Sequence, residues 1–91
     1  MMEQKPVTEV LVDREERQTL VEFATTLETI ARKLKEEGAF ILTEGEREIL
    51  VNPSDTLKVE YSYEKKGDKH SFEIEFDWRT GDQAPGKLGI K

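Results

Sequence analysis

Apolar and polar residues alternate strictly in two segments near the end of the sequence, residues 57–63 and 72–78, with Gly67-Asp68 between them. A period of two is typical of a strand with one buried face, and a Gly-Asp pair favours a two-residue hairpin turn. The sequence therefore predicts a β-hairpin with one apolar and one acidic face. This turn pairs Tyr63 with Phe72, Tyr61 with Ile74, Val59 with Phe76 and Leu57 with Trp78.

A period of three to four residues marks the segment from Leu20 to Leu34, which carries one apolar stripe among charged residues. This spacing predicts an amphipathic helix. Asp13 followed by Glu16 has the spacing of a capping box, and Gly38 offers the left-handed residue that ends a helix. The expected helix therefore covers about residues 14–37.

Three shorter segments are also strand candidates. Residues 7–12 are rich in β-branched residues, and residues 39–43 and 47–51 flank a Gly45-Glu46 turn. A two-residue loop at this turn pairs Leu42 with Ile49 and Phe40 with Val51. Together these segments predict an α+β fold, in which one amphipathic helix packs on an antiparallel sheet of about five strands in the order strand-helix-hairpin-hairpin. The expected organisation is a disordered N-terminus at 1–6, a domain at 7–78 and a flexible C-terminal tail at 79–91.

The composition restricts the classes of function. A chain of 91 residues is long enough for one domain, and its net charge of −6 argues against binding to duplex nucleic acid. The sequence contains no cysteine, which excludes disulfides and thiolate chemistry. No apolar run reaches the roughly 20 residues of a membrane span, and the first residues lack a signal-peptide core. We therefore expect a cytoplasmic protein without membrane contact.

The order of these elements, together with two short segments, resembles a known family. The segments are Asp13-Arg14-Glu15-Glu16 at the expected helix start and Glu73-Ile74-Glu75-Phe76-Asp77-Trp78 at the end of the hairpin. Over roughly residues 7–78 the chain resembles the amphi-Trp domain family of small prokaryotic domains. The resemblance implies no reaction, substrate or cofactor. It marks only Trp78, for which a structural role in closing the core competes with stacking on a ligand.

The outward face of the C-terminal hairpin is predicted to be acidic. Glu60 faces Glu75 in the expected register, and like charges in this position are destabilising. The face could bind a basic partner or a divalent cation, or could be a solvated face that prevents aggregation. Its residues, named the acidic ladder below, are Glu60, Glu64, Glu73, Glu75 and Asp77.

Three apolar residues do not fit a sheet with one buried face. If Val10, Phe40, Leu42, Ile49 and Val51 face the helix, Leu11, Ile41 and Leu50 lie on the opposite side. An exposed apolar patch suggests self-association or a protein partner. The alternatives are a different register or a covering tail, for which Leu88 and Ile90 are available.

These features favour a non-catalytic protein-interaction or assembly module, with a homo-oligomer or another protein as partner. The alternative is a nucleotide or single-stranded nucleic-acid binder that stacks bases on the aromatic residues of the sheet. An enzyme ranks last, because one histidine, no cysteine and no Gly-rich loop leave few groups for chemistry. We expect no catalytic residue, cofactor or metal site, and His70 fits a solvated residue near the turn.

Overall fold

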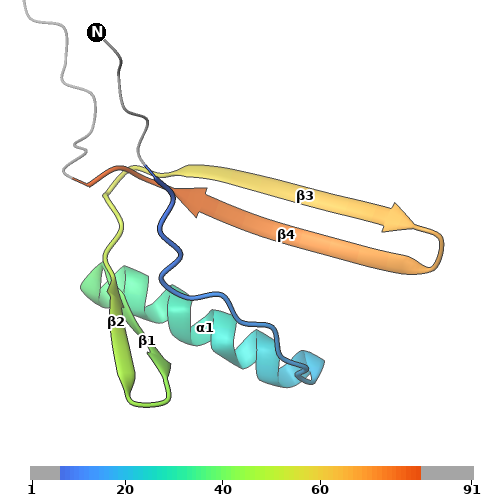
Figure 1. Ribbon diagram of the computed structural model, residues 1–91, viewed down its shortest axis with the longest axis horizontal. Coiled ribbons are helices and arrows are strands. Elements are labelled where there is room, and N and C mark those ends of the chain that lie inside the picture. Colours follow the sequence, from blue (N-terminus) through green and yellow to red (C-terminus); the bar gives the residue numbers. More distant parts are fainter. Residues whose placement is uncertain (1–6, 81–91) are drawn as a thin grey trace, which may run out of the picture.

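The computed structural model describes residues 7–80, which form one helix and two antiparallel hairpins (Figure 1). The expected α+β class is confirmed, with four strands instead of about five. The hairpins form two separate two-stranded sheets, so the expected single sheet is wrong. The elements are α1 (Leu20–Glu37), β1 (Phe40–Glu44), β2 (Arg47–Val51), β3 (Lys58–Lys66) and β4 (Lys69–Asp77).

The helix begins six residues later than the sequence predicted. Thr19 is its N-cap, and the Oγ1 atom of Thr19 accepts a hydrogen bond from the backbone N–H of Glu22 at 3.1 Å. Thr19 and Glu22 also have capping-box spacing, and Thr19 directly precedes the first residue of the apolar stripe. Residues 14–18 offer no apolar side chain for packing, so the cap at Asp13 was the wrong choice. The predicted end of the helix is confirmed. Gly38 has a φ of 71°, in the left-handed region, and its N–H donates to the carbonyl of Leu34.

Removal of the cap at Thr19 is expected to destabilise α1. The Thr19→Ala variant leaves a helix N–H without its partner, and we expect it to lower the free energy of unfolding by about 1 kcal/mol. Urea denaturation followed by circular dichroism measures the change. Thr19→Ser keeps the acceptor and is the matched control, expected to remain close to the unaltered chain. Equal losses in both variants would contradict the capping role.

Both hairpins have the predicted registers. Phe40 pairs with Val51 and Leu42 with Ile49 across the Gly45-Glu46 turn. In β3–β4 the ladder runs from Lys66–Lys69 to Lys58–Asp77, and it includes the predicted pairs Tyr63–Phe72, Tyr61–Ile74 and Val59–Phe76. Leu57 and Trp78 lie one position beyond the last ladder pair. Trp78 instead stacks on Phe76 near the end of β4, with ring centroids 5.8 Å apart.

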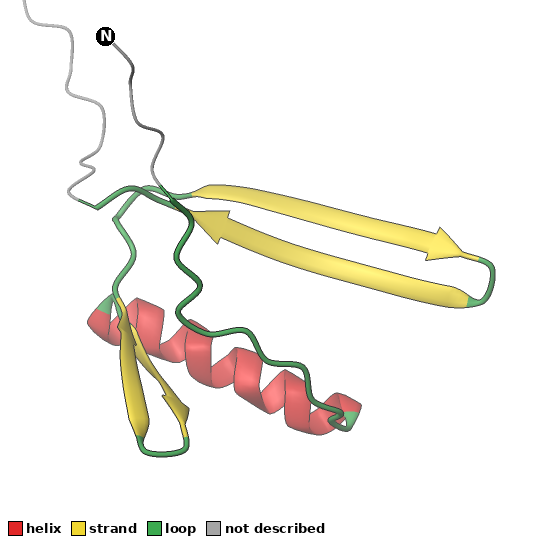
Figure 2. Ribbon diagram, in the orientation of Figure 1, coloured by secondary structure: helices red, strands yellow, loops and turns green. Residues whose placement is uncertain are grey.

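The predicted strand at residues 7–12 is absent from the structure. Figure 2 shows residues 7–19 as a loop. This loop is attached to β2 by the Arg47 guanidinium, whose Nη2 donates to the carbonyl of Leu11 at 3.1 Å. β2 ends at Val51, two residues before Pro53, which has no N–H to donate to a ladder.

Neither β3 nor β4 contacts the helix, so the expected packing of α1 on the C-terminal hairpin is wrong. Among the regular elements, α1 contacts only β1, while β3–β4 projects from the body formed by α1, β1 and β2 (Figure 1). The Cα radius of gyration is 17.5 Å, against about 12 Å for a compact domain of this length. No residue in the range 7–80 is buried. The structure therefore leaves apolar faces open to solvent.

Candidate interaction surfaces

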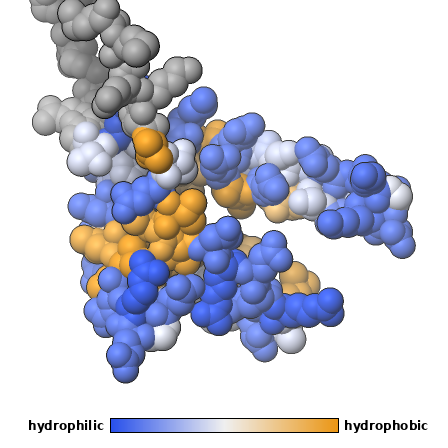
Figure 3. Space-filling model, in the orientation of Figure 1, coloured by the Kyte–Doolittle hydropathy of each residue, from blue (hydrophilic) through white to orange (hydrophobic). Residues whose placement is uncertain are grey.

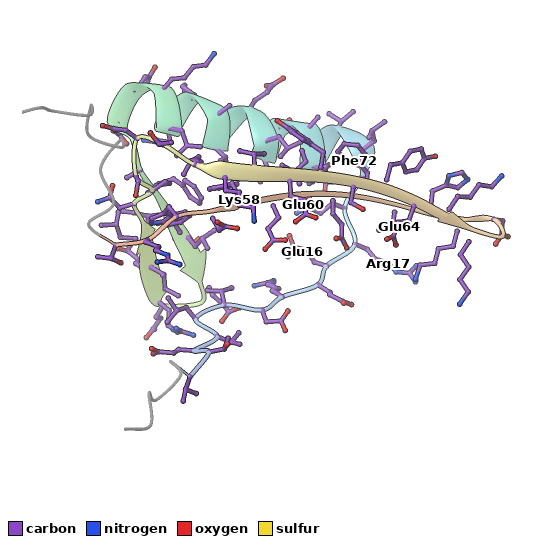
Figure 4. All side chains as sticks on the ribbon, turned by 90° about the horizontal axis from the view of Figure 1, so that it is seen from above. Glu16, Arg17, Lys58, Glu60, Glu64 and Phe72 are labelled. Atoms are coloured by element: carbon purple, nitrogen blue, oxygen red, sulfur yellow. The ribbon has the colours of Figure 1, made fainter. Side chains whose placement is uncertain are left out.

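The first candidate surface is the apolar side of β3–β4, named the hairpin face. Strand alternation places all its side chains on one side, and in Figure 4 Phe72 lies on the opposite side of the hairpin from Glu60 and Glu64. Most of the face is exposed, and Tyr61 retains 69% of its accessible surface. The residues of the hairpin face are Val59, Tyr61, Tyr63, Phe72, Ile74 and Phe76.

The second candidate surface is the apolar stripe of α1, named the helix stripe, which is covered at only one end. Leu20 is 82% exposed and Leu27 is 41% exposed, whereas Ile30 and Leu34 are half-buried. The strands of β1–β2 have five residues each, and their helix contacts are made by β1. The N-terminal half of the stripe, formed by Leu20, Phe23 and Leu27, therefore remains uncovered.

Two of the three residues of the predicted apolar patch lie together. Ile41 pairs with Leu50 across β1–β2, and both side chains are exposed. They line an open groove of about 1100 Å³, whose other walls are the loop from Val12 to Gln18 and the helix around Thr29. Figure 3 shows apolar side chains gathered on this side of the molecule. Leu11 is exposed but does not line the groove.

The acidic ladder is exposed along its whole length. Glu60 faces Glu75 as predicted, whereas Glu64 and Glu73 face serines and Asp77 faces Lys58. In the described range 7–80, no three His, Asp or Glu side chains lie close enough together to hold a metal ion. The arrangement provides a charged, solvated surface, and a basic partner remains a hypothesis.

The turn end of β3–β4 contains a contact between Tyr63 and His70 that was not predicted from the sequence. The Tyr63 hydroxyl lies 2.6 Å from Nδ1 of His70, and the two rings stack with centroids 5.9 Å apart. His70 pairs with Lys65, which places it diagonally across from Tyr63 on the same face. The predicted register of the hairpin already placed Tyr63 and His70 in this diagonal position. The contact orders the turn end of the hairpin face and supplies no nucleophile.

Comparisons with known proteins identify one family. The model of the Amphi-Trp domain matches residues 5–91. No curated protein and no solved structure is significantly similar to the chain. Within the described range, α1 is the only helix, and it lacks the uninterrupted apolar sequence needed to cross a membrane.

Proposed function

The chain belongs to the Amphi-Trp domain family, and we propose that it is a non-catalytic protein-interaction or assembly module. One observation carries the proposal: residues 7–80 contain no buried side chain, although two elements have continuous apolar faces. Folded domains gain most of their stability from the removal of apolar surface from water. A protein partner on these faces would supply the missing burial.

The arrangement of polar groups supports a non-catalytic role. General acid–base catalysis needs a side chain that is held against the substrate, which in most enzymes lies in a concave pocket. The carboxylates of the acidic ladder and the imidazole of His70 are exposed to solvent. The hydroxyls of Thr25, Thr26 and Thr29 in the groove beside β1 donate to helix carbonyls at 2.9–3.1 Å. The groove is open to solvent, and its charged lining residues are Asp13, Arg14, Glu16, Lys33, Glu37 and Glu44.

The exposure of the hairpin face also favours the alternative function, a single-stranded nucleic-acid binder. Tyr61, Tyr63 and Phe72 are accessible to bases because the helix does not cover them. The net charge of −6 opposes such binding. Fluorescence titration with oligothymidylate at low salt tests it. Binding that is lost in Tyr61→Leu would support base stacking, and no binding would remove this candidate.

Photo-crosslinking in the cells that produce the protein tests the interaction function. We expect the photoreactive residue p-benzoylphenylalanine to form protein adducts when it replaces Tyr61 in the hairpin face. Leu50 in the groove is a second probe position, because its 64% exposure allows substitution without loss of the fold. Glu75 lies on the opposite side of the hairpin and is the matched control. If positions 61 and 50 form no more adducts than position 75, the proposed function is wrong.

A further inference from the structure

The hairpin face is longer than the uncovered half of the helix stripe and can therefore extend over all of it. The strands of β3–β4 have nine residues each and are about 30 Å long. The 18-residue helix α1 is about 27 Å long, and its uncovered segment from Leu20 to Leu27 is about 12 Å long. Both surfaces are apolar, and each contains an aromatic residue, Phe23 in the helix stripe and Phe72 in the hairpin face. A long hairpin could therefore cover the half of the helix that β1–β2 leaves open.

The charges at the ends of these surfaces are complementary. The turn end of β3–β4 (residues 65–69) carries three lysines and one aspartate, whereas the start of the helix and the loop before it (residues 13–22) carry four carboxylates and two arginines. In Figures 1 and 4 the hairpin turn and the first turn of α1 point to the same end of the molecule. Opposite charges at an interface orient the partners and speed their association.

The uncovered area is sufficient for a stable dimer. The exposed apolar area of each copy is roughly 1000 Å², if a large apolar side chain carries about 150–250 Å². This area combines the uncovered helix stripe with five residues of the hairpin face, Val59, Tyr61, Tyr63, Phe72 and Ile74. A standard interface buries about 800 Å² per partner. A two-fold dimer buries both surfaces of both copies, because each copy supplies one hairpin face and one helix stripe.

We propose that two copies of this chain form a two-fold dimer by exchange of hairpins: the hairpin face of each copy packs on the N-terminal half of the helix stripe of the other. The inference rests on the proposed interaction function and names its partner as a second copy. In the structure the hairpin lies apart from its own helix, and Ser54 Oγ donates to the Arg79 carbonyl at 3.2 Å where the hairpin joins the connection. This contact ties the two ends of the hairpin together at its base.

Cysteine crosslinking of the full chain tests the exchange, because the natural sequence contains no cysteine. The variants Leu27→Cys, in the helix stripe, and Ile74→Cys, in the hairpin face, are mixed and oxidised under mild conditions. The side chains of Leu27 and Ile74 are partly exposed, so the substitutions are compatible with folding. Circular dichroism checks that both variants fold. We expect a covalent heterodimer as the main product on non-reducing gels. Thr25→Cys mixed with Glu75→Cys is the matched control and is expected to stay monomeric.

The double variant Leu27→Cys/Ile74→Cys separates exchange from closure of the hairpin on its own helix. Exchange produces a covalent dimer, whereas closure within one chain produces a monomer with an internal disulfide and overturns the inference. A natural chain that stays monomeric in sedimentation equilibrium also overturns it. If the natural chain is monomeric but photo-crosslinking gives adducts whose mass differs from that of a dimer of this chain, the interaction function is still supported, with another protein as the partner. The absence of adducts of any mass would remove both proposals.

Discussion

The Ile74→Asp variant is expected to sediment as a monomer at concentrations at which the unaltered chain is a dimer. Ile74 lies in the middle of the hairpin face and is 53% exposed in the single chain. In the dimer, a carboxylate at this position would lie against the helix stripe of the partner without a counter-charge. The two-fold dimer contains the substitution twice, so a cost of about 3 kcal/mol at each position raises the dissociation constant roughly ten-thousandfold. Sedimentation equilibrium over a concentration series measures it.

The neighbouring residue supplies the control for this variant. Glu75 follows Ile74 in β4 and points to the opposite side of the hairpin, so Glu75→Gln is expected to leave the dissociation constant within a few-fold of its original value. Circular dichroism of both variants checks that β3–β4 persists. Dimerisation of Ile74→Asp with unchanged affinity would show that the hairpin face does not form the interface.

The Gly67→Val variant is expected to lose the β3–β4 hairpin. Gly67 has φ 61° in the two-residue turn, a conformation that costs a residue with a β-carbon about 1–2 kcal/mol. An isolated two-stranded hairpin is only marginally stable in water, so this penalty is large compared with its stability. Amide hydrogen exchange of residues 58–77 measures the loss, which we expect to be accompanied by a change in Trp78 fluorescence.

Gly67→Asn is the matched control for the turn. Asparagine adopts positive φ more easily than valine, so we expect this variant to retain most of the protection in β3 and β4. The helix and β1–β2 do not contact this hairpin, and their amides should exchange alike in both variants. Unchanged protection in Gly67→Val would show that the turn does not limit hairpin stability.

The starting point of α1 shows how two local signals compete. Asp13 and Thr19 both precede a glutamate by three residues, and both are good N-cap residues. Only the segment after Thr19 has an apolar stripe that can pack on another element, because residues 14–18 are polar throughout. The apolar stripe begins directly after the Thr19 cap, so the two signals coincide there and not at Asp13, although Leu20 itself is 82% exposed in the single chain.

Three contacts of the structure were not predicted from the sequence. The Tyr63–His70 contact is compatible with the predicted register, in which His70 was interpreted as a solvated residue near the turn. The Arg47–Leu11 hydrogen bond joins positions 36 residues apart, so no local spacing indicated it. The stacking of Trp78 on Phe76 replaced the predicted partner Leu57, because the ladder ends one pair earlier.

The sequence by itself determined the helix end, both hairpin turns and the register of every predicted pair within the two ladders. These features depend on positive φ at glycine, on alternation and on helical spacing, all of which act over a few residues. Only the tertiary structure decided that the two hairpins form separate sheets, that residues 7–12 are not a strand and that the hairpin face is uncovered. The hydrophobic effect favours the removal of an apolar face from water, but it is non-directional and does not determine which element or partner covers that face.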